Sequence, residues 1–184
     1  MFFTKHKNKS DEELMVLVKH RDHQAFSILY NRYADRLCAF FYRMLWADRE
    51  MAEDFVHDLF SKLINKPEQY NDDYMVKPWL FRIASNMCKN AYRKRNFENA
   101  YREMCQQEPS YEEDHDLSLD EVVLTDQIHE ILDRMDEERK MIFLLRYQQE
   151  LPVQEIAEML DMAAGTVKSR IYYTKERIKT SIKY

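Results

Sequence analysis

The chain has 184 residues, a formal charge of −5 and a single glycine, Gly165. Tight turns and phosphate-cradling loops depend on glycine's freedom at positive φ, so this composition excludes a glycine-rich nucleotide loop and disfavours a hairpin-rich β fold. No apolar run approaches the roughly 18 residues of a membrane span, and the first residues lack the apolar region of a signal peptide. The three cysteines form no CxxC pair, which suits reduced thiols. We therefore expect an all-α protein that acts in the cytoplasm without inserting into a membrane.

Apolar residues that recur at three- and four-residue steps predict a succession of helices. A capping box formed by Ser10 and Glu13 opens the first, and Ser118 begins a second such box later in the chain. Pro67 ends the third helix, and Pro78 lies in the first turn of the fourth. The expected helices span about residues 11–20, 22–46, 48–65, 78–104, 118–135, 136–149, 152–160 and 164–181.

The net charge is unevenly distributed along the chain. Residues 103–121 hold eight acids and no Lys or Arg, so the rest of the chain carries +3. Residues 77–102 hold seven basic residues against one acid, and residues 165–184 hold six against one. The acidic stretch also lacks hydrophobic periodicity, which is typical of a solvated linker. We expect two small helical domains, at 1–102 and 121–184, joined by a flexible acidic linker at 103–120.

The C-terminal pattern is that of a helix-turn-helix. A short amphipathic helix over residues 152–160 has Ala157 at its centre, and a turn over residues 161–163 leads into a second helix that opens at Gly165. Small residues where two helices cross, followed by a basic exposed side, are typical of a helix that enters the DNA major groove. The predicted duplex contacts are Thr166, Lys168, Ser169, Arg170, Tyr172, Tyr173 and Lys175.

The helix predicted over residues 78–104 has a cationic and amide stripe opposite its apolar face. The stripe consists of Arg82, Asn86, Lys89, Asn90 and Arg93. Aromatic residues accompany it, and aromatic rings beside cations are the usual means of holding unpaired bases. These rings are Tyr70, Tyr74, Trp79, Phe81 and Tyr92. The sequence predicts a single-strand surface here, separate from the duplex-reading helix.

An enzyme is the class to weigh against a binding protein. Asp54 with His57, and Asp126 with His129, have the i, i+3 spacing of di-iron bundles. Such sites use the longer Glu side chain, however, and these two pairs fall on opposite sides of the predicted linker. His6 stands in a polar context typical of a surface residue. We expect no metal, no cofactor, no small-molecule substrate and no catalytic residue, so the chain is not expected to be an enzyme.

Six segments in order resemble the extracytoplasmic-function group of the sigma-70 family. The resemblance covers about residues 22–181. The N-terminal matches fall in sigma region 2: FSILYNRY at 26–33, AEDFVHDLFSKL at 52–63, PWLFRIASN at 78–86 and YRKR at 92–95. The C-terminal matches fall in the region 4 helix-turn-helix: EIAEML at 155–160 and GTVKSR at 165–170.

The resemblance implies both partners and roles. The partners are core RNA polymerase, through its β′ clamp helices and β flap, promoter DNA, and an anti-sigma factor. Region 2.2 binds the clamp helices, which assigns polymerase contact to Asp54, Asp58 and Phe60. Region 2 melts the −10 element, which assigns DNA contact to Tyr70, Asn71, Asp72, Asp73, Trp79, Arg82, Asn86, Lys89, Asn90 and Arg93. Region 4 reads the −35 duplex through the helix-turn-helix residues given above.

One other function fits the helix-turn-helix alone. A free-standing transcriptional regulator would bind a duplex operator without polymerase and use its N-terminal bundle to sense a ligand or to dimerise. Such a regulator has little use for the basic and aromatic helix over residues 78–104, so we favour the sigma factor.

Overall fold

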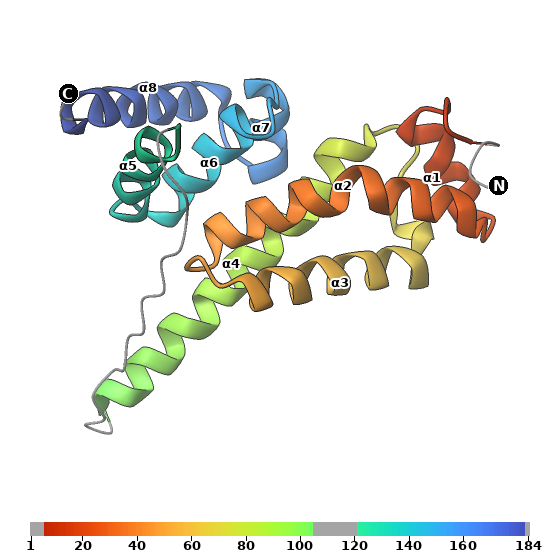
Figure 1. Cartoon of the computed structure of the whole chain (residues 1–184), viewed down its shortest axis with the longest axis horizontal. Coiled ribbons are helices and arrows are strands. Elements are labelled where there is room, and N and C mark those ends of the chain that lie inside the picture. Colours follow the sequence, from red (N-terminus) through yellow and green to blue (C-terminus); the bar gives the residue numbers. More distant parts are fainter. Residues whose placement is uncertain (1–5, 105–120, 183–184) are drawn as a thin grey trace.

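A computed structural model of the chain describes residues 6–104 and 121–182. Within these ranges every regular element is helical, which confirms the all-α prediction. An N-terminal unit contains four α-helices and a short 3-10 turn, and a C-terminal unit contains four more α-helices (Figure 1). They are α1 (Asp11–Lys19), α2 (His23–Met44), α3 (Arg49–Asn65), η1 (Pro67–Gln69), α4 (Val76–Met104), α5 (Glu121–Asp133), α6 (Glu137–Tyr147), α7 (Val153–Leu160) and α8 (Ala164–Ser181).

Short polar side chains fix where several helices begin. Ser10 and Glu13 form the capping box of α1, as the sequence predicts. Asp48 and Asp136 accept backbone N–H groups at the starts of α3 and α6. Such caps satisfy N–H groups that have no partner within the helix, and each stabilises it by about 1 kcal/mol. The cap predicted at Ser118 lies outside the described residues.

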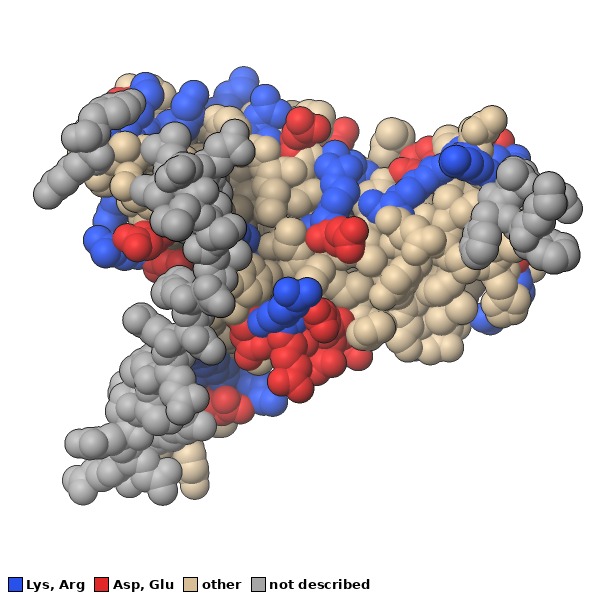
Figure 2. Space-filling view, viewed as in Figure 1, with Lys and Arg blue, Asp and Glu red and all other residues tan. Residues whose placement is uncertain are grey.

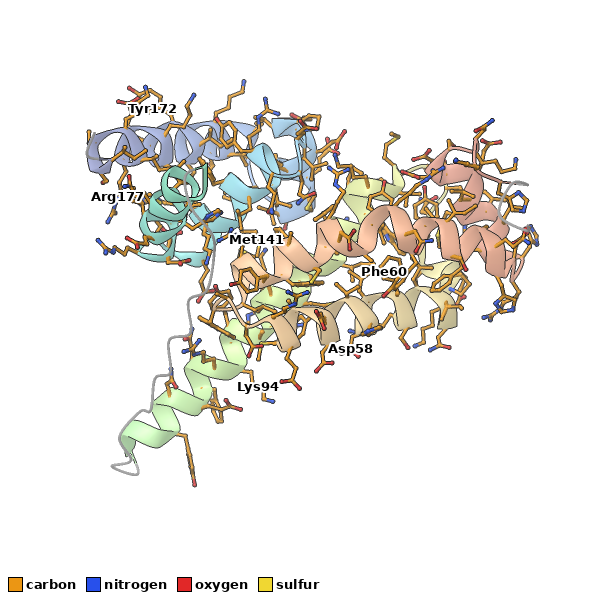
Figure 3. The ribbon with its side chains drawn as sticks, in the orientation of Figure 1. Asp58, Phe60, Lys94, Met141, Tyr172 and Arg177 are labelled. Atoms are coloured by element: carbon orange, nitrogen blue, oxygen red, sulfur yellow. The ribbon has the colours of Figure 1, made fainter. Side chains whose placement is uncertain are left out.

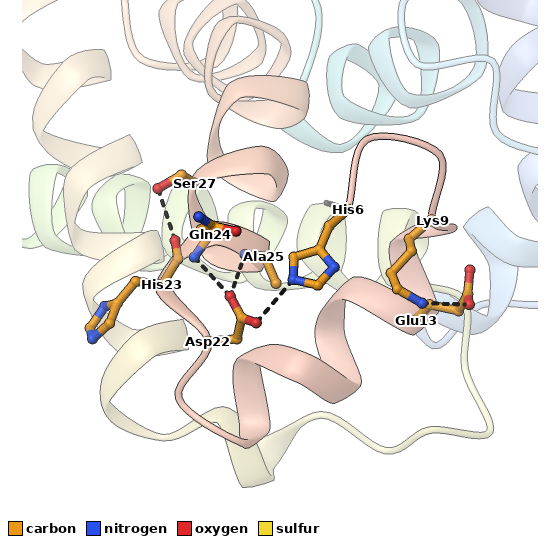
Figure 4. Close-up of polar contacts among 8 residues, drawn as sticks. All are labelled: His6, Lys9, Glu13, Asp22, His23, Gln24, Ala25 and Ser27. Atoms are coloured by element: carbon orange, nitrogen blue, oxygen red, sulfur yellow. Dashed lines mark hydrogen bonds and ion pairs between the residues drawn. The ribbon is translucent and has the colours of Figure 1, made fainter. Parts of the chain in front are cut away.

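The cap of α2 also ties down the N-terminal segment. Asp22 accepts hydrogen bonds from the backbone N–H groups of Gln24 at 2.9 Å and Ala25 at 3.0 Å, and His6 Nε2 lies 3.1 Å from its other oxygen (Figure 4). The Ala25 bond is the main cause that lowers the pKa of Asp22, and His6 adds to it. His6 is buried, so the prediction that it lies on the surface is wrong. Its polar neighbours in sequence did not reveal the carboxylate sixteen residues away.

The core of the N-terminal unit lies between α2, α3 and α4. Phe40 packs edge-on against Phe81 of α4, with ring centroids 5.5 Å apart, and Phe41 packs against Phe55 of α3 at 5.3 Å. Phe40 and Phe41 are both fully buried. This packing fixes α4 by one face and leaves its opposite face to solvent.

The two units contact each other directly. Helix α7 packs on α4, and α6 packs on α2 (Figure 1). Ser85 of α4 is buried in this contact, and its Oγ lies 3.9 Å from Sδ of Met159 in α7. The sequence predicts two domains on a linker but no contact between them, because nothing in its periodicity marks which faces meet.

The turns of this fold do not depend on glycine. Gly165 lies inside the first turn of α8 without a positive φ, and a Cβ atom added to it would meet nothing within 4 Å. The left-handed residue of the helix-turn-helix is Asp161, with φ 57°. Among the described residues, the left-handed positions are Arg21, Trp46, Ala47, Glu150 and Asp161. Gly165 therefore lies at the start of α8, as predicted, and the turn before it is made by Asp161.

We expect Gly165→Ala to keep the fold and to raise the free energy of unfolding by about 0.5 kcal/mol, because alanine restricts the unfolded chain and favours the helix. Thermal unfolding followed by circular dichroism measures this change. Asp161→Ala is the comparison variant. It keeps a Cβ atom at the left-handed position of the turn and removes only the carboxylate. A marked loss of stability in Gly165→Ala would contradict the assignment of the turn to Asp161.

Candidate nucleic-acid and polymerase interface

The predicted stripe on α4 faces solvent. Arg82, Asn86, Asn90 and Arg93 are exposed, and Lys89 is half-buried. The opposite face of the helix is buried in the core, where burial raises the pKa of the Cys88 thiol and keeps it unreactive. Solvent-facing guanidinium and amide groups can bind phosphates and base edges, so the geometry leaves the stripe available to DNA.

The loop before α4 presents polar and apolar side chains to solvent. Asn71, Asp72 and Asp73 are exposed, and Tyr74 and Met75 are 57% and 59% exposed. The Asp73 backbone N–H donates to Asn71 Oδ1 at 3.1 Å, which makes an Asx turn at the tip. This turn shapes the tip of the loop, whose side chains stay exposed to solvent.

Tyr70, which the sequence assigns to DNA contact, is buried beneath this loop. Its ring is only 1% exposed and packs edge-on against half-buried Trp79, with centroids 5.1 Å apart. Burial raises the pKa of Tyr70 to about 12, with the carboxylates of Glu12 and Asp72 adding to the effect, so its hydroxyl stays protonated. That hydroxyl donates to the carbonyl oxygen of Tyr74. Tyr70 therefore supports the loop from below and does not offer its ring for stacking on a base.

Two other aromatic residues along α4 are also buried. Phe81 is fully buried, and Tyr92 is 9% exposed with its hydroxyl donating to the carbonyl oxygen of Met44. Both lie on the face that packs on the bundle. The predicted stacking role of these two rings is wrong. Of the five aromatic residues predicted to stack on bases, exposed Tyr74 and half-buried Trp79 remain as candidates.

Helix α1 holds the loop from the side. Lys19 Nζ lies 2.7 Å from Asp72 Oδ1, and it stands 5.3 Å from the centroid of the Tyr70 ring. Glu12 Oε1 accepts the backbone N–H of Val76, the first residue of α4, at 3.2 Å. Neither Lys19 nor Glu12 could be assigned to this loop from the sequence. Lys19 and Asp72, for example, are 53 positions apart, and no local pattern links them.

We expect Lys19→Ala to reduce DNA melting about two- to fivefold while the free energy of unfolding changes by less than about 1 kcal/mol, since exposed ion pairs stabilise a fold only weakly. Permanganate reactivity of unpaired thymines in a promoter complex measures melting. Lys9→Ala is the control. Lys9 also forms an ion pair with a residue of α1, Glu13, but that pair does not involve the loop. Equal melting by the two variants would show that Lys19 does not position the loop.

Helix α3 presents acidic side chains on its outer side. Asp54 and Asp58 are exposed, as are Glu50 and Glu53, and Figure 2 shows acidic side chains gathered over this helix. Phe60 is instead 2% exposed and lies between α2 and α3 (Figure 3). Its ring packs against Phe26 and Tyr30 of α2, with centroids 5.9 and 4.7 Å away. The predicted direct polymerase contact by Phe60 is therefore wrong, whereas Asp54 and Asp58 are accessible.

The outer face of α8 carries most of the predicted duplex contacts. The exposed residues are Thr166, Lys168, Ser169, Tyr172, Tyr173 and Lys175, and Figure 3 shows Tyr172 pointing away from the other helices. Arg170 is different, because its guanidinium forms an ion pair with Glu138 of α6 and is partly buried. Arg170 therefore helps to hold α8 on α6, a role that the sequence alone did not indicate.

Over residues 6–104 and 121–182, no cluster of three or more His, Cys, Asp or Glu side chains could hold a metal ion. In the same described part of the chain, no helix is both long and apolar enough to cross a membrane. One concavity of about 260 Å³ is lined by Gln127, Glu130, Ile131, Arg134, Arg177 and Ser181.

Comparison with known proteins gives a consistent result over both units. Residues 29–98 match the family model for sigma-70 region 2, and residues 125–178 match that for sigma-70 region 4. The chain is 26% identical over 183 residues to the RNA polymerase sigma-H factor of Pseudomonas aeruginosa, which covers 95% of this chain and 94% of the relative. It is 28% identical over 175 residues to the ECF RNA polymerase sigma factor SigW of Bacillus subtilis, covering 90% and 93%.

A solved structure shares the fold. It is that of the sigma factor RpoE in complex with the anti-sigma factor NepR from Bartonella quintana. The TM-score is 0.69 at 22% identity, over 84% of this chain and 94% of that one.

Proposed function

This chain belongs to the sigma-70 family, in its extracytoplasmic-function group, and on that premise we propose a role for each of its exposed surfaces. It is a sigma factor, which binds core RNA polymerase and directs promoter recognition and DNA melting. This assignment rests mainly on two exposed surfaces in one chain. One is the stripe of cations and amides on α4, and the other is the basic face of α8.

The N-terminal unit, over residues 1–102, binds the −10 element. The stripe on α4 contacts the strand that is not used as template, while the loop tip with Asn71, Asp72 and Asp73 receives an unpaired base. Exposed Tyr74 and half-buried Trp79 stack on unpaired bases, and this stacking offsets the energy lost when a base leaves the duplex.

The C-terminal unit, over residues 121–184, reads the −35 duplex with the outer face of α8. Lys168 and Lys175 neutralise phosphates, and Tyr172 and Tyr173 lie beside them on that face. Residues 103–120 form the acidic linker between the two units, and this assignment rests on their composition.

The exposed acids of α3 bind core polymerase. Asp54 and Asp58 meet the basic side of the β′ clamp helices, and Phe60 acts indirectly by holding α3 on α2. The C-terminal unit contacts the β flap. Since the solved relative was crystallised with an anti-sigma factor, we also propose that this chain is held inactive by such a partner.

The chain has no chemical step of its own. Sigma factors in general are not enzymes, and the nucleotide transfer belongs to core polymerase. We propose that this sigma factor acts in the cytoplasm, where core polymerase and the chromosome are found, and that it needs no cofactor.

Mapping transcription start sites after overexpression tests the assignment. We expect a set of new start sites preceded by two shared sequence elements, spaced as −35 and −10 elements are. The alternative, a free-standing regulator, predicts stable operator binding without polymerase and changed use of existing start sites. An Asp54→Lys/Asp58→Lys variant that still folds should not produce the new start sites. This loss would show that the start sites depend on binding of the chain to core polymerase.

A further inference from the structure

Helix α4 continues past the bundle that holds its first half. Figure 1 shows its C-terminal end projecting beyond α2 and α3. A cation–π contact anchors the helix where it leaves the bundle: Arg95 Cζ lies 4.0 Å from the centroid of the Trp46 ring. Beyond this anchor, Phe97 is 75% exposed and Tyr101 is 63% exposed. Large apolar rings on a projecting helix have no packing role in the described fold.

These two rings continue the DNA-facing stripe. Arg82, Asn86, Asn90, Arg93, Phe97 and Tyr101 follow one another at steps of four, four, three, four and four residues. Residues at such steps lie on one face of an α-helix, and here they cover roughly 28 Å of its length. The face therefore begins in the second turn of α4 and ends with two exposed aromatic side chains.

The charge around the rings selects the partner. Residues 89–102 hold five basic residues and one acid. Lys94 projects from α4 into solvent (Figure 3), with its Nζ 3.8 Å from Glu98 Oε1. A basic surface of this kind suits the phosphate backbone, which fixes a helix on the duplex, while aromatic carbon can contact thymine methyl groups in the major groove. An apolar patch between cations is poorly suited to a second copy of this chain, because the same cations would face each other.

We propose that Phe97 and Tyr101 extend the promoter contact of α4 onto the duplex that flanks the melted −10 element. The proposal rests on the function proposed above, in which the loop end of α4 receives the unpaired base. The opposite end of the helix then points away from the unpaired bases, toward DNA that is still paired. Arg93 and Lys94 bind its phosphates, and the two rings contact its base edges.

Two synthetic DNA probes test this, both built on a promoter found by start-site mapping. One is a fork with a duplex flank next to the single-stranded −10 element, and the other is the same single strand without the flank. With holoenzyme assembled from core polymerase and the full chain, we expect Phe97→Ala/Tyr101→Ala to bind the fork at least about tenfold more weakly than the unmodified chain. Binding of the single strand should be unchanged. Asn99→Ala is the control, since Asn99 belongs to the same part of α4 but lies roughly opposite Phe97 and Tyr101 around the helix.

The outcomes separate this proposal from the assigned function. If the unmodified holoenzyme binds neither probe, the assigned function itself is at fault. If it binds both and the double variant matches it on the fork, the proposal is overturned. A double variant that changes the sedimentation of the free chain, or its affinity for an anti-sigma factor, but not its binding to the fork would assign the rings to a protein partner instead.

Discussion

Tyr70→Ala is expected to lower the free energy of unfolding by about 3–5 kcal/mol, the usual effect of removing a large buried ring. Tyr70 is 1% exposed, packs against Trp79 and donates a hydrogen bond to the Tyr74 carbonyl, so its loss leaves a cavity under the loop. Tyr74→Ala, four residues on and 57% exposed, should change stability by less than about 0.5 kcal/mol.

Urea unfolding followed by circular dichroism measures both variants. Tyr70→Phe separates the ring from the hydroxyl: it should cost only about 1 kcal/mol, the net value of one hydrogen bond whose acceptor can turn to water. A stable Tyr70→Ala variant that fails to melt DNA would reverse our reading and return Tyr70 to the DNA-contacting set. A Tyr74→Ala variant that is stable yet impaired in melting fits the arrangement described here.

The second large effect concerns the stripe on α4. Arg82→Ala/Asn86→Ala/Arg93→Ala should weaken promoter complexes at least about 100-fold, because each contact to a base or phosphate typically contributes 1–3 kcal/mol. All three side chains are exposed, so stability should stay within about 1 kcal/mol of the unmodified chain. Since two phosphate-binding cations are removed, the slope of log affinity against log salt concentration should fall by about two.

Electrophoretic mobility shift of holoenzyme–promoter complexes across a salt series measures both quantities. Arg134→Ala/Arg139→Ala is the matched control, because it removes two exposed arginines of the C-terminal unit that are not part of the stripe. Equal losses in the two variants would mean that overall charge, and not the stripe, governs binding. Core polymerase binding should be unaffected in both, since the acids of α3 are untouched.

The helices could be predicted from the sequence because their signals are local. Apolar residues at helical spacing and caps such as Ser10 and Asp22 depend on neighbours within a few positions. The exposure of Asn86 and Arg93 could likewise be predicted, since both lie opposite the apolar side of a single helix.

The errors share a physical cause. Whether an aromatic or a charged side chain is buried or paired depends on distant partners. Tyr70 and Phe60 were therefore assigned to binding surfaces although they pack inside the fold, and Arg170 although its guanidinium pairs with Glu138. The support of the loop by Lys19 was missed for the same reason. Composition likewise does not indicate which residue of the turn is left-handed, because Asp161 and not a glycine takes that conformation.

Promoter-directed transcription with purified core polymerase is the most direct test of the central claim, that this chain confers promoter recognition on core. The template carries a promoter found by start-site mapping, and the matched template has its −10 element scrambled. We expect transcripts of defined length only when core, chain and intact promoter are combined, and a loss of most product with the Arg82/Asn86/Arg93 variant. Absence of transcript, together with stable binding of the same DNA by the chain alone, would contradict the claim and favour a free-standing regulator.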